Sequence, residues 1–245
     1  MKLFKAILLL FIFISPLSAN TIYNLIKIPN LEIYEIKTKN KLKYFYAASS
    51  FRLGVQKNII CLNPSKKNLD LKYKKISKNL NKYSYSYLKK INLKYIVLCE
   101  NLSISGINTA GIPDNIMKTL ILDINFNENF FERVIHHEVF HIINDQYKEI
   151  FNENEWGKFN DSEFIYAECS TCTEKLGLET YSKTNGFFTE YSKSTASEDM
   201  AEVYSYMVIS GKDYINEIIG ADPILKKKIL YIESKIKEID NSFSF

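Results

Sequence analysis

The chain has 245 residues, of which 46% are hydrophobic and 14% aromatic, with eight glycines, five prolines and a formal net charge of +4. This composition excludes a disordered or collagen-like chain, and the length is enough for one large domain with a sizeable core. The small net charge gives no support for nucleic-acid binding.

The first nineteen residues have the organisation of a secretory signal peptide. Lys2 and Lys5 precede an apolar run over residues 6–14, and the segment 15–19 ends in Ala19, after which we expect cleavage. The apolar run is too short for a stable membrane anchor, and no later segment reaches eighteen uninterrupted apolar residues. We therefore predict an exported protein, periplasmic or extracellular, without stable membrane insertion.

Residues 20–66 are expected to form a β-rich N-terminal lead-in, and residues 67–245 the main domain. Strand-like runs occupy residues 44–47 and 58–62. Next, apolar and aromatic side chains recur at spacings of four and three, the period of one helix face, with lysines between them. These side chains are Leu69, Tyr73, Ile76, Leu80, Tyr83 and Tyr87. We interpret the pattern as one amphipathic helix whose lysines form a solvated face, the alternative being a docking surface for an anionic partner.

Two further apolar runs, residues 95–98 and 120–124, are predicted strands. The segment between them contains a glycine and a proline, at residues 111–115, and is predicted to be a loop. A helix is predicted to begin near Asn127, a residue type that commonly caps helices.

The C-terminal part is predicted to be helical. One helix begins near Ser197, where Thr195 and Glu198 have the spacing of a capping box. The last helix begins at Asp222-Pro223. The order of strands, helix, irregular segment and further helices favours an α+β domain.

The segment His137-Glu138-Val139-Phe140-His141 lies on the helix predicted from Asn127. Residues four apart share a helix face, so the two imidazoles can bind one ion while Glu138 projects beside them toward a metal-bound water. The remaining histidine, His136, points about 100° away around the helix, and we interpret it as structural. The motif predicts one Zn²⁺ ion, with Glu138 as the catalytic base.

A catalytic zinc takes three protein ligands and leaves one position for water. No histidine follows His141, so we expect the third ligand to be a carboxylate or, less favoured, a thiolate. Glu198 and Glu202 are four residues apart on one predicted helix face. One of them can bind the metal while the other accepts the free N–H of a ligand histidine, and the alternative is that both face solvent.

The segment from Tyr191 to Glu202 resembles the corresponding segment of the anthrax lethal factor catalytic domain and of related bacterial zinc metallopeptidases. The resemblance rests on Tyr191, on Glu198 seven residues later and on the Ala-Glu pair that ends at Glu202, with an Asn-Gly-Phe lead-in at residues 185–187. It extends loosely back to about Tyr87. It implies a zincin-like fold of the gluzincin type, in which a small sheet backs the His-Glu-x-x-His helix and the C-terminal part is helical.

The resemblance also implies a role for each matching residue. Glu198 would be the third zinc ligand, Glu202 would steady a ligand histidine, and the hydroxyl of Tyr191 would stabilise the oxyanion of the tetrahedral intermediate. One departure from the family pattern is Phe140, which stands where the family has a small glycine and which puts the shape of the pocket in question.

The chain has four cysteines, an even number that favours disulfides in an exported protein. We expect Cys61 to pair with Cys99, because both lie in strand-like runs, and Cys169 to pair with Cys172. In the competing interpretation, Cys169 and Cys172 form half of a zinc knuckle, although no second pair of ligands follows.

These observations predict an exported zinc-dependent endopeptidase with a peptide or protein substrate. An extended substrate would pair with the strand at residues 120–124 if that strand lies at a sheet edge facing the metal. Two alternatives are a zinc hydrolase that acts on cell-wall peptides and a non-catalytic envelope protein that binds a partner. The sequence gives no basis for an oligomeric state.

Overall fold

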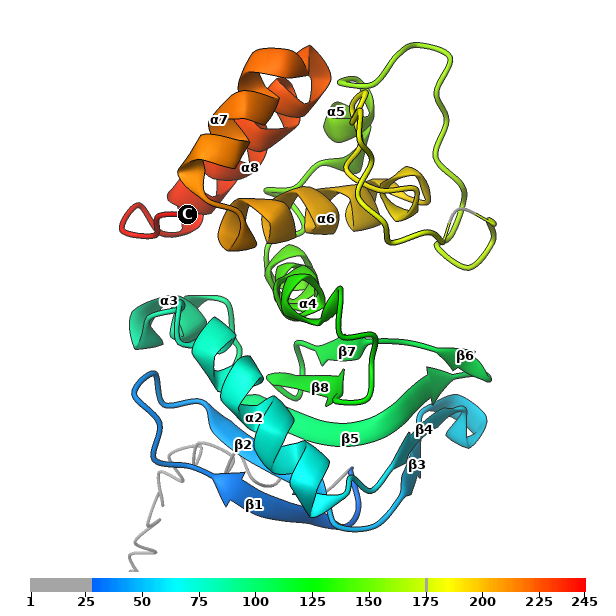
Figure 1. Cartoon of the computed structure of the whole chain (residues 1–245), viewed down its shortest axis with the longest axis vertical. Helices are drawn as coiled ribbons and strands as arrows, with labels where there is room; N and C mark the ends of the chain where they lie inside the picture. The colour runs from blue at the N-terminus through cyan, green and yellow to red at the C-terminus, as the bar shows by residue number, and fades with distance from the viewer. Residues whose placement is uncertain (1–27, 175) are drawn as a thin grey trace, which may run out of the picture.

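The structure of the protein, a computed structural model, describes residues 28–174 and 176–245 (Figure 1). The predicted signal peptide, residues 1–19, lies outside the described residues. Within them, a curled eight-stranded sheet combines with seven α-helices, so the mixed α+β class is confirmed. None of the described helices is long and apolar enough to cross a membrane.

The longest strand, β5 (Tyr95–Ile104), belongs to both halves of the sheet. Its first half pairs in parallel with β2 (Lys43–Ala47) on one side and with β8 (Thr119–Asp123) on the other. Its second half pairs antiparallel with β4 (Ile59–Leu62) and with the short β6 (Ile107–Asn108). The sheet therefore changes direction along β5, which gives it the curl seen in Figure 1.

Three outer strands complete the sheet, each antiparallel to its neighbour. β1 (Leu31–Glu35) pairs with β2, β3 (Phe51–Leu53) with β4, and β7 (Gly111–Asp114) with β8. The segment expected to be a β-rich lead-in thus supplies β1 to β4, which join the same sheet as β5 and β8.

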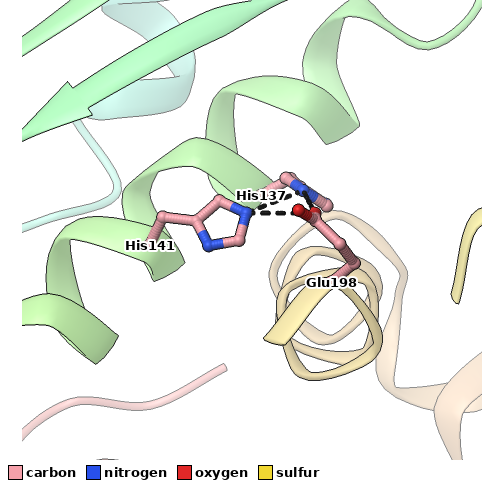
Figure 2. A group of neighbouring side chains, drawn as sticks. All are labelled: His137, His141 and Glu198. Carbon is pink, nitrogen blue, oxygen red and sulfur yellow. Dashed lines mark hydrogen bonds and ion pairs between the residues drawn. The ribbon is translucent and has the colours of Figure 1, made fainter. Parts of the chain in front are cut away.

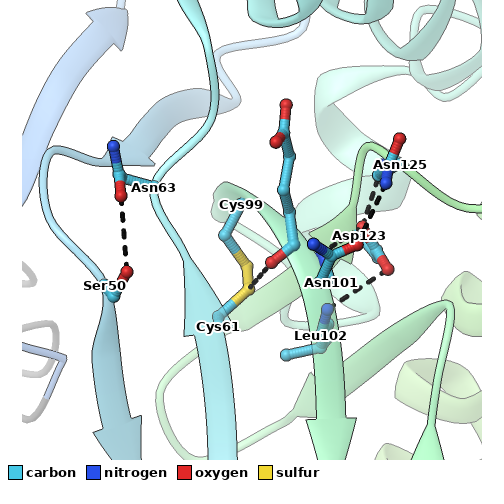
Figure 3. Close-up of a disulfide and its surroundings, with 9 residues drawn as sticks. Ser50, Cys61, Asn63, Cys99, Asn101, Leu102, Asp123 and Asn125 are labelled. Carbon is cyan, nitrogen blue, oxygen red and sulfur yellow. Dashed lines mark hydrogen bonds between the residues drawn. A yellow bond between two sulfur atoms is a disulfide. The ribbon is translucent and has the colours of Figure 1, made fainter.

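The bend of β5 is held by one carboxylate and one disulfide (Figure 3). Asp123, at the end of β8, accepts backbone N–H bonds from Asn101 (2.9 Å) and Leu102 (3.2 Å), at the point where β5 leaves the first half-sheet. Asn101 has a left-handed backbone there (φ 52°), a conformation that asparagine tolerates. The adjacent disulfide between Cys61 and Cys99 is fully buried and ties β4 to β5.

The position of β8 contradicts one expectation. β8 has β5 on one side and β7 on the other, so the strand at residues 120–124 is internal, and the hypothesis that it pairs with substrate is wrong. The segment 111–115, predicted to be a loop, instead contains β7, which among the described strands pairs only with β8.

Pro113 explains why the sequence of β7 suggested a loop. The N–H of Asp123 donates to the carbonyl of Ala110, so the alternation of an antiparallel ladder turns the Pro113 backbone away from β8. A proline in that position removes no hydrogen bond from the ladder, which is why an edge strand accepts it.

The predicted long amphipathic helix is two helices, α2 (Lys66–Leu80) and α3 (Tyr85–Lys90). The side chain of Ser84 accepts the N–H of Tyr87 and starts α3 after a short turn. The apolar periodicity continues through this turn because both helices pack on the same core, so periodicity alone did not reveal the break.

Five helices follow β8. They are α4 (Phe131–Gln146), α5 (Glu153–Gly157), α6 (Ala196–Ile209), α7 (Lys212–Ala221) and α8 (Pro223–Ile239). Thr195 caps α6 by accepting from the N–H of Glu198, and Asp222 caps α8 by accepting from those of Ile224 and Leu225, as predicted. The Glu198 carboxylate bonds to His137 and His141, so the second half of the predicted capping box does not form.

α4 begins four residues later than the predicted start at Asn127. The side chain of Asn127 accepts the N–H of Asn129 in a turn that precedes the helix, and α4 begins at Phe131.

The core has two parts, one on each face of the sheet. Ile96 and Leu98 of β5 face the larger cluster, which also contains the inner faces of α2, α4, α6 and α8. The alternate residues Tyr95, Val97 and Cys99 face a smaller cluster behind the sheet. α4 therefore lies between the sheet and α6, and most of its circumference is buried.

We expect loss of the Cys61–Cys99 bond to lower the free energy of unfolding by about 2–4 kcal/mol, because the bond closes a loop with a sequence separation of 38. The change is Cys61→Ala with Cys99→Ala, and the measurement is equilibrium denaturation in guanidinium chloride. The matched control replaces Cys169 and Cys172 by alanine. That bond spans a separation of only 3, so the loss should be smaller, and equal losses would contradict the loop-closure explanation.

Candidate metal centre

α4 and α6 cross with polar side chains between them. His137 and His141 lie one turn apart on α4 and face α6. Glu198 lies in the first turn of α6, where the Thr195 cap fixes its backbone. The crossing of the two helices thus brings Glu198 to two histidines that precede it by 61 and 57 residues (Figure 2).

The three side chains converge on one point. The Nε2 atom of His137 is 2.9 Å from Oε2 of Glu198, and Nε2 of His141 is 3.2 Å from the same oxygen. The two Nε2 atoms are 3.1 Å apart. Among the described residues, this is the group of three or more histidine, cysteine or carboxylate side chains whose ligand atoms lie close enough to hold a metal ion.

The donor set and its spacing fit zinc. Two imidazole nitrogens and one carboxylate oxygen are ligands of the type found in catalytic zinc sites, which leave a fourth position for water. A tetrahedral zinc ion with bonds of roughly 2.0–2.1 Å separates its ligand atoms by roughly 3.3 Å. The observed separations of 2.9–3.2 Å are close to that value, so little movement is needed to bind the ion.

Glu202 lies one turn after Glu198 on α6 and contacts the opposite edge of the first histidine. Oε1 of Glu202 lies 2.9 Å from Nδ1 of His137, so the opposite nitrogen of this ring, Nε2, is the one that faces Glu198 and the metal position. Glu202 is 1% exposed. Burial lowers the pKa of His137, but its hydrogen bonds to Glu198 and Glu202 outweigh burial and raise the pKa to about 10.

The carboxylate of Glu198 is ionised for a related reason. Burial favours its neutral form, but His141 and His137 hold the pKa of this carboxyl well below its usual range. A negatively charged oxygen therefore faces the two imidazoles, which is the state in which a carboxylate binds a metal.

Glu138 is 7% exposed, its side chain contacts β7 at Gly111, and its carboxyl group is near enough to the three ligand side chains to interact with their charges. Its pKa is raised by burial, and the nearby histidines only partly oppose that shift. The Glu138 side chain packs against Gly111: a Cβ atom built on Gly111 would lie 2.7 Å from Cγ of Glu138. Because Gly111 has no side chain, β7 can approach the carboxylate of Glu138, the residue that the motif predicts to be the base.

Tyr191 begins a 3-10 turn (Tyr191–Lys193) just before α6, and its ring centroid is 5.9 Å from that of His137. Burial and the charges of Glu198 and Glu138 raise the pKa of its phenol, so the hydroxyl keeps its proton. It faces the same space as the three ligand side chains, and its proposed role at the oxyanion stays a prediction.

His136 and Phe140 point away from this centre. Nδ1 of His136 accepts from the hydroxyl of Tyr83 at 2.6 Å, Nε2 lies 3.1 Å from Oδ1 of Asn79, and burial lowers its pKa to about 3. This neutral, fully paired imidazole is structural, as predicted. The ring of Phe140 packs in the core against Phe151, so the bulky residue does not fill the metal position.

The two remaining cysteines form a disulfide between Cys169 and Cys172, in the irregular segment before Tyr191. Both sulfur atoms are used in this bond, which leaves none for a metal. The zinc-knuckle interpretation is therefore wrong, and both cysteine pairs are those favoured from the sequence.

Two buried networks next to the centre leave no direct signal in the sequence. In one, Arg133 and Thr189 both donate to Oε2 of Glu202. In the other, Oδ2 of Asp199 accepts from Lys228 (2.6 Å) and from the single tryptophan, Trp156 (2.8 Å). Arg133 precedes His137 by one helical turn, a spacing that could have nominated it, whereas Thr189 lies in irregular structure without any periodicity.

A family model described as "Putative zinc-binding metallo-peptidase" matches residues 76–239. A crystal structure of a protein from Bacteroides caccae, described in the same words, is similar over 75% of this chain and 74% of that chain, with 18% identity and a TM-score of 0.48. A search of curated proteins finds no match.

Zinc should stabilise the folded chain, because only the folded state brings the three ligands together. At a free zinc concentration 100 times the dissociation constant, the stabilisation is about 2.7 kcal/mol, which corresponds to a rise in Tm of roughly 5–10 °C for a chain of this size. A thermal melt with and without zinc measures it, and a chelator should reverse it. His141→Ala is expected to abolish the shift, and an unchanged shift in that variant would place the ion elsewhere.

Proposed function

This chain belongs to the zinc-binding metallo-peptidase family, and on that premise we propose that it is an exported zinc-dependent endopeptidase. The observation that carries the proposal is the convergence of His137, His141 and Glu198 on one point, with the Glu138 carboxyl group near enough to interact with their charges. The two disulfides support export, because such bonds persist in oxidising compartments.

The proposal assigns one zinc ion to His137, His141 and Glu198. When bound there, zinc supplies a water whose pKa is lowered toward about 7 and polarises the carbonyl of the scissile bond. All three ligands come from residues 67–245, which we propose as the catalytic domain of zincin type, with the sheet backing α4.

Glu138 is the proposed general base. It is buried beside the metal position, and the same burial that raises its pKa brings that pKa nearer to the range in which a carboxylate exchanges protons efficiently at neutral pH. An Oε atom of Glu138 takes a proton from the attacking water and then delivers it to the nitrogen of the leaving amine.

Tyr191 is the proposed oxyanion donor. Its phenol keeps its proton because burial and two nearby carboxylates oppose ionisation. It can therefore donate a hydrogen bond to the carbonyl oxygen as negative charge develops there, which is the stage at which such a bond accelerates the reaction.

An extended peptide is the substrate shape that fits this site. β7 passes Glu138 at Gly111, and its outer side has no partner among the described strands. A peptide that adds to this edge would lie beside both the base and the metal position.

The first test compares the wild-type chain with Glu138→Gln and Glu198→Ala, measuring bound zinc and cleavage of an unstructured protein. Glu138→Gln should keep zinc but lose at least about 100-fold in kcat, because the base is gone and the ligands remain. Glu198→Ala should lose both zinc affinity and cleavage.

Glu217→Ala, on the exposed face of α7, is the matched control and should behave as wild type. If the wild type binds zinc but cleaves neither unfolded protein nor purified cell wall, the chain is a non-catalytic binding protein and the proposal fails. Cleavage of cell wall alone would narrow the substrate to cell-wall peptides.

A second prediction concerns Gly111→Ala. The added methyl would meet Cγ and Cδ of Glu138 at 2.7 and 2.9 Å, so the Glu138 side chain must move while the three ligands stay in place. We expect kcat to fall by roughly 10–100-fold with unchanged zinc content, since small misplacements of a catalytic group are costly. Gly220→Ala, where a methyl meets open space, is the control. Retained activity in Gly111→Ala would argue against Glu138 as the base.

A further inference from the structure

Glu202 contacts the ligand histidine with one oxygen and is itself held by the other. Oε1 accepts from Nδ1 of His137, whereas Oε2 accepts from Nη1 of Arg133 and, at 2.8 Å, from the hydroxyl of Thr189. The carboxylate thus has a separate partner set on each oxygen. Its rotation would break bonds on both sides, so the Oε2 donors control where Oε1 lies.

Arg133 is fixed from several directions. It is 5% exposed, and its Nη2 donates to the backbone carbonyl of Leu178 at 2.6 Å. Nη1 also lies 3.1 Å from the hydroxyl of Tyr206, and the guanidinium lies 5.0 Å from the centre of that ring. A planar group with bonds to two separate acceptors has one orientation, which makes Arg133 a rigid donor to Glu202.

Arg133 and His137 occupy the same face of α4, one turn apart. The contacts therefore form a closed circuit: Arg133 binds Glu202, Glu202 binds His137, and one turn of helix joins His137 back to Arg133. Such a circuit fixes both the position of the imidazole along the helix and the rotation of its ring.

We propose that Arg133 is a positioning residue that sets the orientation of His137 toward zinc by holding the carboxylate of Glu202. The inference rests on the proposed function, because it requires His137 to be a zinc ligand. Zinc affinity then depends on a cation outside the His-Glu-x-x-His motif, Arg133.

The experiment measures zinc affinity by competition with a chromophoric chelator for the wild type, Arg133→Met, Arg133→Lys and Tyr206→Phe. Arg133→Met should weaken zinc binding by roughly 10–100-fold, the range seen when partners of ligand histidines are removed. Arg133→Lys should recover part of this loss, because a lysine can reach Glu202 but does not also bond to the Leu178 carbonyl. Tyr206→Phe removes a contact of Arg133 without touching Glu202 and should stay within about twofold of the wild type.

A spectroscopic readout separates positioning from general loss of stability. Cobalt(II) replaces zinc in such sites, and its visible d–d absorption reports the arrangement of the ligands. Arg133→Met should shift this spectrum, whereas Tyr206→Phe should leave it unchanged even if its Tm falls. If Arg133→Met lowers Tm but keeps the wild-type zinc affinity and cobalt spectrum, Arg133 has only a structural role and the proposal is overturned.

Arg133→Met leaves Glu202 buried without its cation, and such a variant can fail to fold. Thr189→Val then tests whether the donors to Oε2 of Glu202 control zinc affinity, because it removes the second donor with little change in shape or charge. We expect zinc binding at least severalfold weaker in this variant, and wild-type affinity would refute control through Oε2. A wild type that binds no zinc would instead refute the proposed function itself, so the two failures are distinguishable.

Discussion

Burial of charge between α4 and α6 is the constraint on which the centre depends. Water does not reach most of this interface, so each charged group must be neutralised by a neighbour. The result is a row of alternating partners from Arg133 through Glu202, His137 and Glu198 to His141. Because each member satisfies the next, moving any one of them would leave another charge without a partner. The row is therefore stiff, and stiffness is what a precise coordination geometry requires.

The part of the site that follows from local periodicity was predictable. The spacing of His137 and His141 alone places them on one helix face. Thr195 is a typical capping residue, and it predicts the start of the helix that carries Glu198. Interactions between distant segments were not predictable in this way. Gly111 meets Glu138 only because β7 folds against α4, and Thr189 reaches Glu202 from irregular structure. Neither residue has a neighbour in the sequence that reveals its contact.

In the fold, too, the elements with local sequence signals were predictable and the others were not. The C-terminal helix was predictable because Asp222 and Pro223 combine a cap with a residue suited to the first turn. The break between α2 and α3 was hidden because Tyr83, in the turn, is as buried as the helical residues around it. Strand β7 was mistaken for a loop because glycine and proline usually interrupt strands, a rule that edge position relaxes.

Pro113 on β7 has a further consequence for the behaviour of the protein at high concentration. A sheet edge with a full row of N–H and C=O groups invites pairing with another copy and hence aggregation. The outward-facing backbone of Pro113 offers no N–H, which interrupts that row just two residues after Gly111. A second copy of the sheet could therefore not extend hydrogen bonds along the whole edge. Pro113, which makes this strand hard to recognise in the sequence, therefore limits edge-to-edge pairing along β7.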